Sequence, residues 1–262
     1  FHHPERQYQI FREEKDYYKS NSIEGARALA KDLGIPYFEI DMRREFYHCV
    51  MQDFAETYLN GQTPNPCVRC NEHIRFSRFI ELLGMKLSEE QLVEGPRNFL
   101  FSTGHYVRTL EKEGTTYLRK GADLRKDQSY MLYRIPPTIL PRLVFPLGNL
   151  TKIEVKAIAR NQGFVSAESD ESQDICFIHG DYPDFIRNFT STDKGNQPGR
   201  IYTTKGEYLG DHRGYLHYTI GQRKGLGLAN GPWYVNSIDS EKNIIEVTAP
   251  EEFGIFKFIV KN

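Results

Sequence analysis

The sequence predicts an α/β fold, in which helices cover a parallel sheet, followed by a small β-rich domain. Before about residue 190, helical and strand patterns alternate along the chain, which is typical of a parallel sheet with covering helices. From about residue 199, short alternating runs are separated by turn-forming residues, a pattern typical of all-β structure. The turn-rich stretch STDKGNQPG separates the two patterns. We therefore expect an α/β domain over residues 1–190 and a β-rich domain over residues 191–262.

Three helices are expected from periodicity and capping residues. Apolar residues at helical spacing predict helices over residues 22–34 and 45–59. A third helix is expected to begin after Thr151, which forms a capping box with Glu154, and to end at Gly163.

Strands are expected over residues 35–41 and 97–106, the second leading into a glycine turn. The strands expected in the β-rich domain cover residues 200–204, 207–212, 215–220, 232–238 and 243–249.

Composition excludes several classes of protein. With 39% hydrophobic residues and a formal net charge of -1, the chain is expected to fold around a core rather than stay disordered. No run approaches the roughly 18 apolar residues of a membrane span, so no membrane partner is expected. The first residues lack the features of a signal peptide, which favours a cytoplasmic location. Four cysteines are too few for a disulfide scaffold.

Charge is unevenly distributed along the chain. Residues 119–160 hold nine basic and three acidic residues, a net charge of +6, whereas residues 161–184 hold six acidic residues and no Lys or Arg. These neighbouring segments could compensate one another. Alternatively, the basic segment could contact the phosphate backbone of a nucleic acid beside a reactive site.

The stretch TPNPCVRCN contains a C-x-x-C pair at the expected start of a helix. Asn65 is a suitable N-cap and Pro66 suits the first helical position, so Cys67 and Cys70 fall in the first turn and a half. The positive end of the helix dipole, together with Arg69, is expected to lower the pKa of either thiol. The pattern therefore predicts reactive cysteines.

Other interpretations of this pair remain open at this point. A structural zinc site would need further ligands at suitable spacing, and Cys49 and Cys176 are distant in sequence, so no metal site is expected. A thioredoxin-like motif would need different flanking residues. The two cysteines could also be small core residues.

Six segments, in this order, resemble the bacterial tRNA-specific 2-thiouridylases, the MnmA family. They are TPNPCVRCNEHIRF, FSTGHYVR, LRKGADLRKDQSYMLYRI, FPLGNLTKIEVKAIARNQG, ESQDICFIHGDY and PGRIYTTKGEYLGDHRGYLHYTIGQRKGLG. The resemblance covers nearly all of residues 22–247. It implies a Rossmann-like domain of the adenine nucleotide alpha hydrolase type. It also implies an enzyme that uses ATP and Mg²⁺ to adenylate the C2 oxygen of uridine 34 in certain tRNAs and then replaces that oxygen with sulfur.

The resemblance implies roles for two cysteines. Cys70 directly precedes the Asn of the motif C-N-x-x-I-K/R-F and corresponds to the nucleophile. Cys176 lies in the motif S-Q-x-I-C-F and corresponds to the cysteine that carries a persulfide. That sulfur would come from a cysteine desulfurase or a sulfur relay protein, and the reaction would end with free hydrosulfide or a Cys70–Cys176 disulfide. Without the resemblance, Cys176 would be expected to be a buried strand residue.

Further positions correspond to binding residues of the family. Gly104 matches a position that contacts ATP, and Asn65, Pro66 and Cys67 match positions that hold the target base. Some members carry an Asp at the position of Cys67, so its role is open here. The residues that match tRNA-contacting positions are His105, Lys126, Asp127 and Gln128.

Two features of the family are not found in these residues. The S-G-G-x-D-S pyrophosphate loop has no counterpart, and neither does the C-terminal β-barrel that helps to hold tRNA. We expect the chain to be part of a longer protein that carries both. The alternative is a non-catalytic tRNA-binding protein or a persulfide relay protein. No glycine-rich methyl-donor loop is present, which argues against an S-adenosylmethionine methyltransferase.

Overall fold

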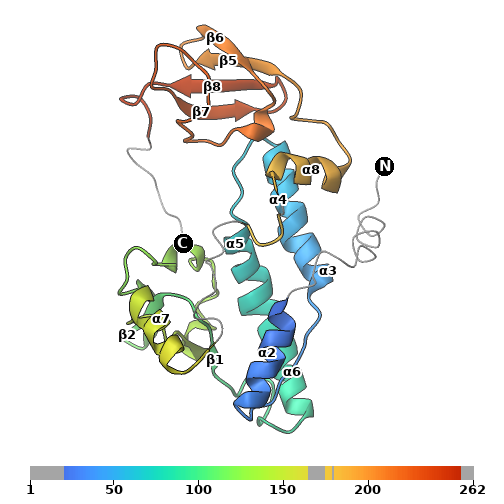
Figure 1. Ribbon diagram of the computed structural model, residues 1–262, viewed down its shortest axis with the longest axis vertical. Coiled ribbons are helices and arrows are strands. Elements are labelled where there is room, and N and C mark those ends of the chain that lie inside the picture. The colour runs from blue at the N-terminus through green and yellow to red at the C-terminus, as the bar shows by residue number, and fades with distance from the viewer. Residues whose placement is uncertain (1–20, 165–174, 179, 255–262) are drawn as a thin grey trace. The chain divides into compact units, whose positions relative to one another are not determined.

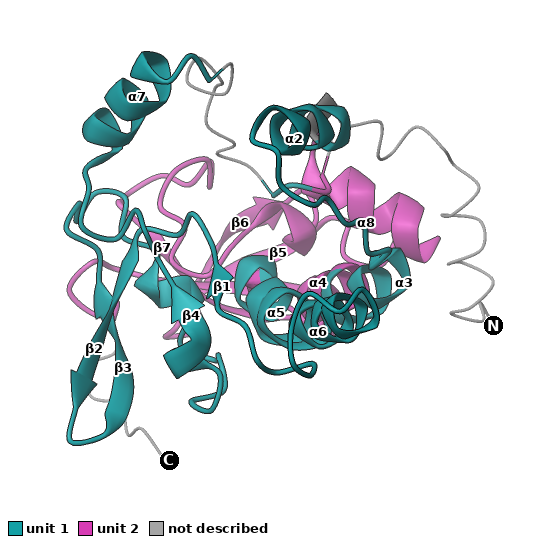
Figure 2. Cartoon of the chain, turned by 90° about the horizontal axis from the view of Figure 1, so that it is seen from below, with its two compact units in different colours: residues 1–50, 66–176 teal, residues 51–65, 177–262 magenta. Residues whose placement is uncertain are grey.

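The computed structural model describes residues 21–164, 175–178 and 180–254, and the chain divides into two compact units (Figure 2). Unit 1 comprises Phe1–Val50 and Pro66–Cys176, and unit 2 comprises Met51–Asn65 and Phe177–Asn262. The domain boundary expected near residue 190 stays a prediction.

Two of the predicted helices are present near the start of the described chain. The helix α2 (Asn21–Asp32) ends before Gly34, whose φ of +64° is the left-handed conformation that suits glycine after a helix. The second helix runs without a break through α3 (Arg43–Phe46), the π-helical η2 (Tyr47–Gln52) and α4 (Asp53–Leu59). Both predictions are confirmed.

A long helix that begins at Pro66 organises unit 1 (Figure 1). It consists of α5 (Pro66–Arg69), the π-helical η3 (Cys70–Arg78) and α6 (Phe79–Glu89). Pro66 occupies the first helical position, as predicted. The helix buries Phe76 and Ile80 in an apolar core whose other members are Val107, Leu132, Ile135, Leu140 and Leu143. Burial of each large apolar side chain stabilises the fold by roughly 1.5–3 kcal/mol.

The strands of unit 1 are short. β1 (Phe101–Ser102) pairs in parallel with β4 (Leu143–Val144), which follows the 3₁₀ turn η5 (Leu140–Arg142). Parallel pairing was expected. β2 (Val107–Lys112) and β3 (Thr115–Lys120) form an antiparallel hairpin that was not predicted. Its two-residue loop, Glu113-Gly114, has φ values of 52° and 75°, which suit a type I′ turn.

The helix α7 (Lys152–Asn161) begins as predicted. Thr151 accepts a hydrogen bond from the backbone N–H of Glu154, and the Glu154 carboxylate accepts one from the N–H of Thr151. Gly163, with φ of +71°, follows its last turn.

The strand predicted over residues 35–41 is wrong. No strand is assigned there, and none of the strands in the described residues pairs with its backbone. Side chains hold the segment instead: Arg27 forms an ion pair with Glu39 and lies 5.8 Å from the ring centre of Tyr37.

Unit 2 contains a four-stranded sheet in the order β6-β5-β8-β7. Its strands are β5 (Gly199–Thr203), β6 (Tyr208–His212), β7 (Tyr234–Asp239) and β8 (Ile244–Thr248). β5 pairs with β8 in parallel, and the other two pairs are antiparallel. The β-rich character is therefore confirmed.

One predicted strand of unit 2 is wrong. Within residues 215–220 the chain forms the 3₁₀ turn η7 (Tyr215–His217). Tyr215 and Leu216 are both buried although they are consecutive, whereas neighbouring residues of a strand point to opposite faces. The helix α8 (Tyr182–Thr190) precedes the sheet, and its Phe185 contacts Phe177 with ring centres 5.4 Å apart.

Candidate functional site

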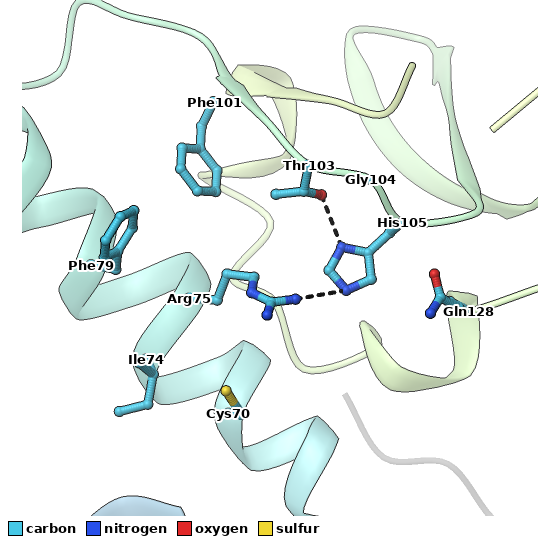
Figure 3. A pocket seen from close by; sticks show the side chains of 9 residues that line it. All are labelled: Cys70, Ile74, Arg75, Phe79, Phe101, Thr103, Gly104, His105 and Gln128. Carbon is cyan, nitrogen blue, oxygen red and sulfur yellow. Dashed lines mark hydrogen bonds between the residues drawn. The ribbon is translucent and has the colours of Figure 1, made fainter. Parts of the chain in front are cut away.

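A cavity of about 500 Å³ lies in unit 1 between the long helix and the loop that follows β1 (Figure 3). This volume is within the range of roughly 300–1,000 Å³ found for small-molecule sites. The side chains around it are apolar at one end and polar at the other. The residues that line it are Cys70, Ile74, Arg75, Phe79, Phe101, Thr103, Gly104, His105 and Gln128.

Cys70 and Arg75 line the same cavity because the middle of the long helix is π-helical. A π-helix forms hydrogen bonds between residues five apart, so residues i and i+5 fall on nearly the same face. In an α-helix, with 3.6 residues per turn, residues five apart would point to different sides. The π-helical segment therefore brings the Cys70 thiol and the Arg75 guanidinium to one wall.

His105 is buried, and both of its ring nitrogens are bonded. An N–H of Arg75 lies 3.2 Å from Nε2, and Oγ1 of Thr103 lies 2.9 Å from Nδ1. Because a guanidinium can only donate, Nε2 must accept, so the proton resides on Nδ1 and is donated to Thr103. Burial, and then the charge of Arg75, lower the pKa of His105 to about 4. The imidazole is therefore neutral at physiological pH.

Three thiols interact electrostatically in this region: Cys67, Cys70 and Cys176. Cys67 and Cys176 are exposed and Cys70 is half-buried. Desolvation raises the pKa of all three, that of Cys70 to about 11. Arg75 opposes this shift at each thiol.

The expectation of a lowered thiol pKa is wrong. Burial outweighs the favourable charge, since it is the largest cause of the shift for each thiol. The nearby cation is also different from the one expected. Arg69 lies 3.5 Å from the carboxylate of Glu72, and Arg75 supplies the positive charge that acts on the thiols.

The four cysteines, all in the described residues, form no disulfide. Cys176 is exposed and lies outside any strand, unlike the buried strand residue that its apolar neighbours alone would suggest. Within residues 21–164, 175–178 and 180–254, no group of three or more His, Cys, Asp or Glu side chains is placed to hold a metal ion. No helix in the same residues is long and apolar enough to cross a membrane.

Comparison with known proteins accounts for most of the chain. Residues 5–180 match the family described as the tRNA methyl transferase HUP domain, and residues 185–249 match the tRNA methyl transferase PRC-barrel domain. The chain is 42% identical over 235 residues to "tRNA-specific 2-thiouridylase MnmA 1" of Caldanaerobacter subterraneus subsp. tengcongensis. It is 39% identical over 247 residues to "tRNA-specific 2-thiouridylase MnmA" of Dehalococcoides mccartyi. The chain belongs to the MnmA family.

The matches cover 88% and 94% of this chain, but only 61% and 65% of the two MnmA relatives. The chain thus spans less than two thirds of their length. An MnmA relative from Phocaeicola vulgatus gives the same picture, with 42% identity over 90% of this chain and 61% of its own. A HUP domain of the adenine nucleotide alpha hydrolase type followed by a β-rich PRC-barrel domain confirms the expected fold class.

The structure brings together four of the residues singled out by the resemblance to MnmA. Cys70, Gly104, His105 and Gln128 line one cavity. Gln128 holds the loop after β1 through two hydrogen bonds to Tyr106. The side-chain oxygen of Gln128 accepts from the backbone N–H of Tyr106 at 2.9 Å, and the backbone N–H of Gln128 donates to the Tyr106 carbonyl at 3.1 Å.

The remaining MnmA positions lie outside the residues that line the cavity. Pro66 is buried, and Asn65 directly before it is exposed. Lys126 is half-buried. Asp127 stabilises its own loop, since its carboxylate accepts hydrogen bonds from the Gly121 N–H and the Ser129 hydroxyl at 2.9 and 2.8 Å.

Sequence reasoning missed Arg75 and Thr103 as parts of this site. A signal for Arg75 was available, because it occupies the K/R position of the motif C-N-x-x-I-K/R-F that begins at Cys70. An α-helical reading places Arg75 away from Cys70, and only the π-helical geometry brings them together. Thr103 had no signal, since its bond to His105 depends on the turn after β1.

Proposed function

We propose that the chain carries the catalytic centre of a tRNA 2-thiouridylase, which modifies uridine 34. The observation that carries the proposal is that the Cys70 thiol lines a cavity together with Gly104, while Cys176 is near enough to act electrostatically on Cys70. The names and the 39–42% identity of the relatives support this assignment.

The residues of the cavity suit a planar base. Ile74, Phe79 and Phe101 provide apolar surface, and the rings of Phe79 and Phe101 have centres 6.0 Å apart. Gly104 has no side chain to cover its backbone, and a Cβ there would meet only Leu147, at 3.6 Å. These residues would hold the base and one side of ATP. The co-substrate ATP supplies the leaving group on the uridine C2 oxygen.

The two thiols would then carry out the sulfur transfer. The terminal sulfur of a persulfide on Cys176 forms a bond to C2 as the bond between C2 and the adenylated oxygen breaks. A Cys70 thiolate attacks the Cys176 sulfur, and the electrons of the broken S–S bond pass to the sulfur on C2, which becomes the thiocarbonyl. A Cys70–Cys176 disulfide remains, and an external dithiol must supply two electrons to reopen it.

Cysteine variants of the full-length protein test the proposal. Cys70→Ser and Cys176→Ser should each abolish 2-thiouridine formation, measured by mass spectrometry of digested tRNA. Cys67→Ser should have a milder effect. Cys49→Ser is the matched control, because Cys49 is not one of the three interacting cysteines. Near-wild-type thiolation by Cys70→Ser or Cys176→Ser would remove that residue from the mechanism. Complete loss of thiolation in Cys67→Ser would mean that Cys67, and not Cys70, is the nucleophile of the C-x-x-C pair.

A non-catalytic tRNA-binding protein or a persulfide relay is the competing function. Either would leave tRNA unmodified when the wild-type full-length protein is supplied with ATP, Mg²⁺ and a persulfide donor. The sulfurtransferase predicts 2-thiouridine under these conditions and none when ATP is omitted.

A further inference from the structure

Arg75 occupies a distinctive position in the cavity. Among the described residues that line the cavity it is the only charged side chain, since His105 is neutral. Its positive charge acts on Cys67, Cys70 and Cys176 alike. One guanidinium therefore acts electrostatically on every thiol to which the proposed function assigns chemistry, and it lines the cavity together with Cys70.

The guanidinium is also held in place by a hydrogen bond. One N–H donates to Nε2 of His105 at 3.2 Å, and His105 is in turn fixed by its bond to Thr103 (Figure 3). A guanidinium carries five N–H donors in a rigid plane, so fixing one of them orients the rest. Because neutral His105 acts only as an acceptor toward Arg75, it fixes the cation without cancelling its charge.

The chemistry needs a cation at this point. Sulfur attacks as an anion, yet burial makes the thiolate of Cys70 unfavourable and raises the pKa of this thiol to about 11. The titratable groups that act on Cys70 are Cys67 and Cys176, which oppose a second negative charge, and Arg75, which favours it. Removing Arg75 would leave the thiolate without a cation among the residues that line the cavity.

We propose that Arg75 is the anion-binding residue of this site: its guanidinium, oriented by neutral His105, binds the sulfur anion that forms at Cys70. Its part in turnover rests on the proposed function, whereas its effect on the thiol does not. The same charge would stabilise the negative charge that passes to the C2-bound sulfur as the S–S bond of the Cys176 persulfide breaks.

The rate at which Cys70 reacts with iodoacetamide, measured across pH without tRNA or ATP, tests this directly. Cys70 begins a tryptic peptide that ends at Arg75 in the wild type and at Arg78 in Arg75→Gln, so mass spectrometry follows this thiol alone. At pH 8, Arg75→Gln should react about fivefold more slowly than the wild type, because below the pKa the thiolate fraction falls about tenfold for each unit by which the pKa rises. Arg75→Lys, which keeps the charge, should restore most of the rate.

A matched control lies one turn further along the helix. Arg78 forms an ion pair with Glu81 at 2.8 Å and is not among the residues that line the cavity, so Arg78→Met should leave the profile of Cys70 unchanged. A second measurement is the ratio of the rates with anionic iodoacetate and neutral iodoacetamide. This ratio should fall in Arg75→Gln, because the cation that attracts the anion is gone.

The outcomes separate the two proposals. Unchanged alkylation rates and reagent ratio in folded Arg75→Gln would overturn the role of Arg75, even if the protein thiolates tRNA. Should Arg75→Gln fail to fold, the ratio of the rates with iodoacetate and iodoacetamide is measured instead in Arg75→Lys and in His105→Phe. The second variant removes the acceptor that orients Arg75. A wild-type ratio in His105→Phe overturns the orientation by His105. If Arg75→Gln alkylates Cys70 more slowly and with a lower reagent ratio, as expected, but neither the wild type nor any variant thiolates tRNA, the result would count against the proposed function alone.

Discussion

The neutral state of His105 predicts a specific loss of stability in mild acid. Burial and Arg75 lower the pKa of His105 from 6.5 to about 4, so the unfolded chain takes up its proton first as the pH falls. The stability that His105 contributes is complete above pH 6.5 and is lost as the pH falls from 6.5 toward 4. Between pH 7 and pH 5 linkage gives a loss of about 2 kcal/mol from this residue.

The variant His105→Gln isolates that contribution. Its side-chain oxygen can still accept from Arg75, but it cannot take up a proton in this range. Urea unfolding followed by circular dichroism at pH 7 and pH 5 gives the loss for each protein. The loss should be about 2 kcal/mol smaller in the variant, and other titrating groups cancel in the difference.

A control and a refuting result define the test. Leu124→Ala changes a side chain that is 74% exposed and does not titrate, so it should retain the wild-type loss between the two pH values. An equal loss in His105→Gln and the wild type would show that His105 is protonated in the folded state near its usual pKa, and the arrangement with Arg75 would then be wrong.

Two further predictions concern tRNA binding and packing. If the basic segment 119–160 contacts tRNA phosphates, Lys126→Ala should reduce the slope of log affinity against log salt by about one, measured by filter binding. The control Lys86→Ala, which removes the ion-pair partner of Glu90, should leave the slope unchanged. An unchanged slope in Lys126→Ala would show that Lys126 does not contact a phosphate. Gly148→Ala should destabilise the protein by about 1–3 kcal/mol or more in urea unfolding, since its Cβ would lie 2.0 Å from the Val107 carbonyl oxygen. Gly25→Ala, with nothing within 4 Å, should be neutral or stabilising, and equal effects of the two substitutions would contradict this packing.

The sequence was most informative where structure depends on neighbouring residues. Pro66 starts its helix, Thr151 caps α7, and Gly34 and Gly163 follow helix ends, because each effect involves only a few consecutive residues. The hairpin of β2 and β3 was equally accessible, since Glu113-Gly114 separates two alternating runs. It was overlooked although its signal was local.

The site was predictable in its membership but not in its electrostatics. The resemblance singled out Cys70, Gly104, His105 and Gln128, and they meet at one cavity. The direction of the thiol pKa could not be read from the helix start, because desolvation depends on packing between segments distant in sequence. The strand expected at 35–41 failed for a related reason, since a strand requires a partner that its own residues do not specify.

The arrangement around Arg75 favours negative charge over positive charge in the same small volume. Its guanidinium lowers the pKa of His105 and also opposes the upward pKa shift of the thiols. Both effects have the same sign: a proton is less stable near Arg75, whichever group holds it. His105 therefore remains an acceptor that orients the cation and does not compete as an acid. The Cys70 thiol, which burial would otherwise keep protonated, is the group whose ionisation this cation assists.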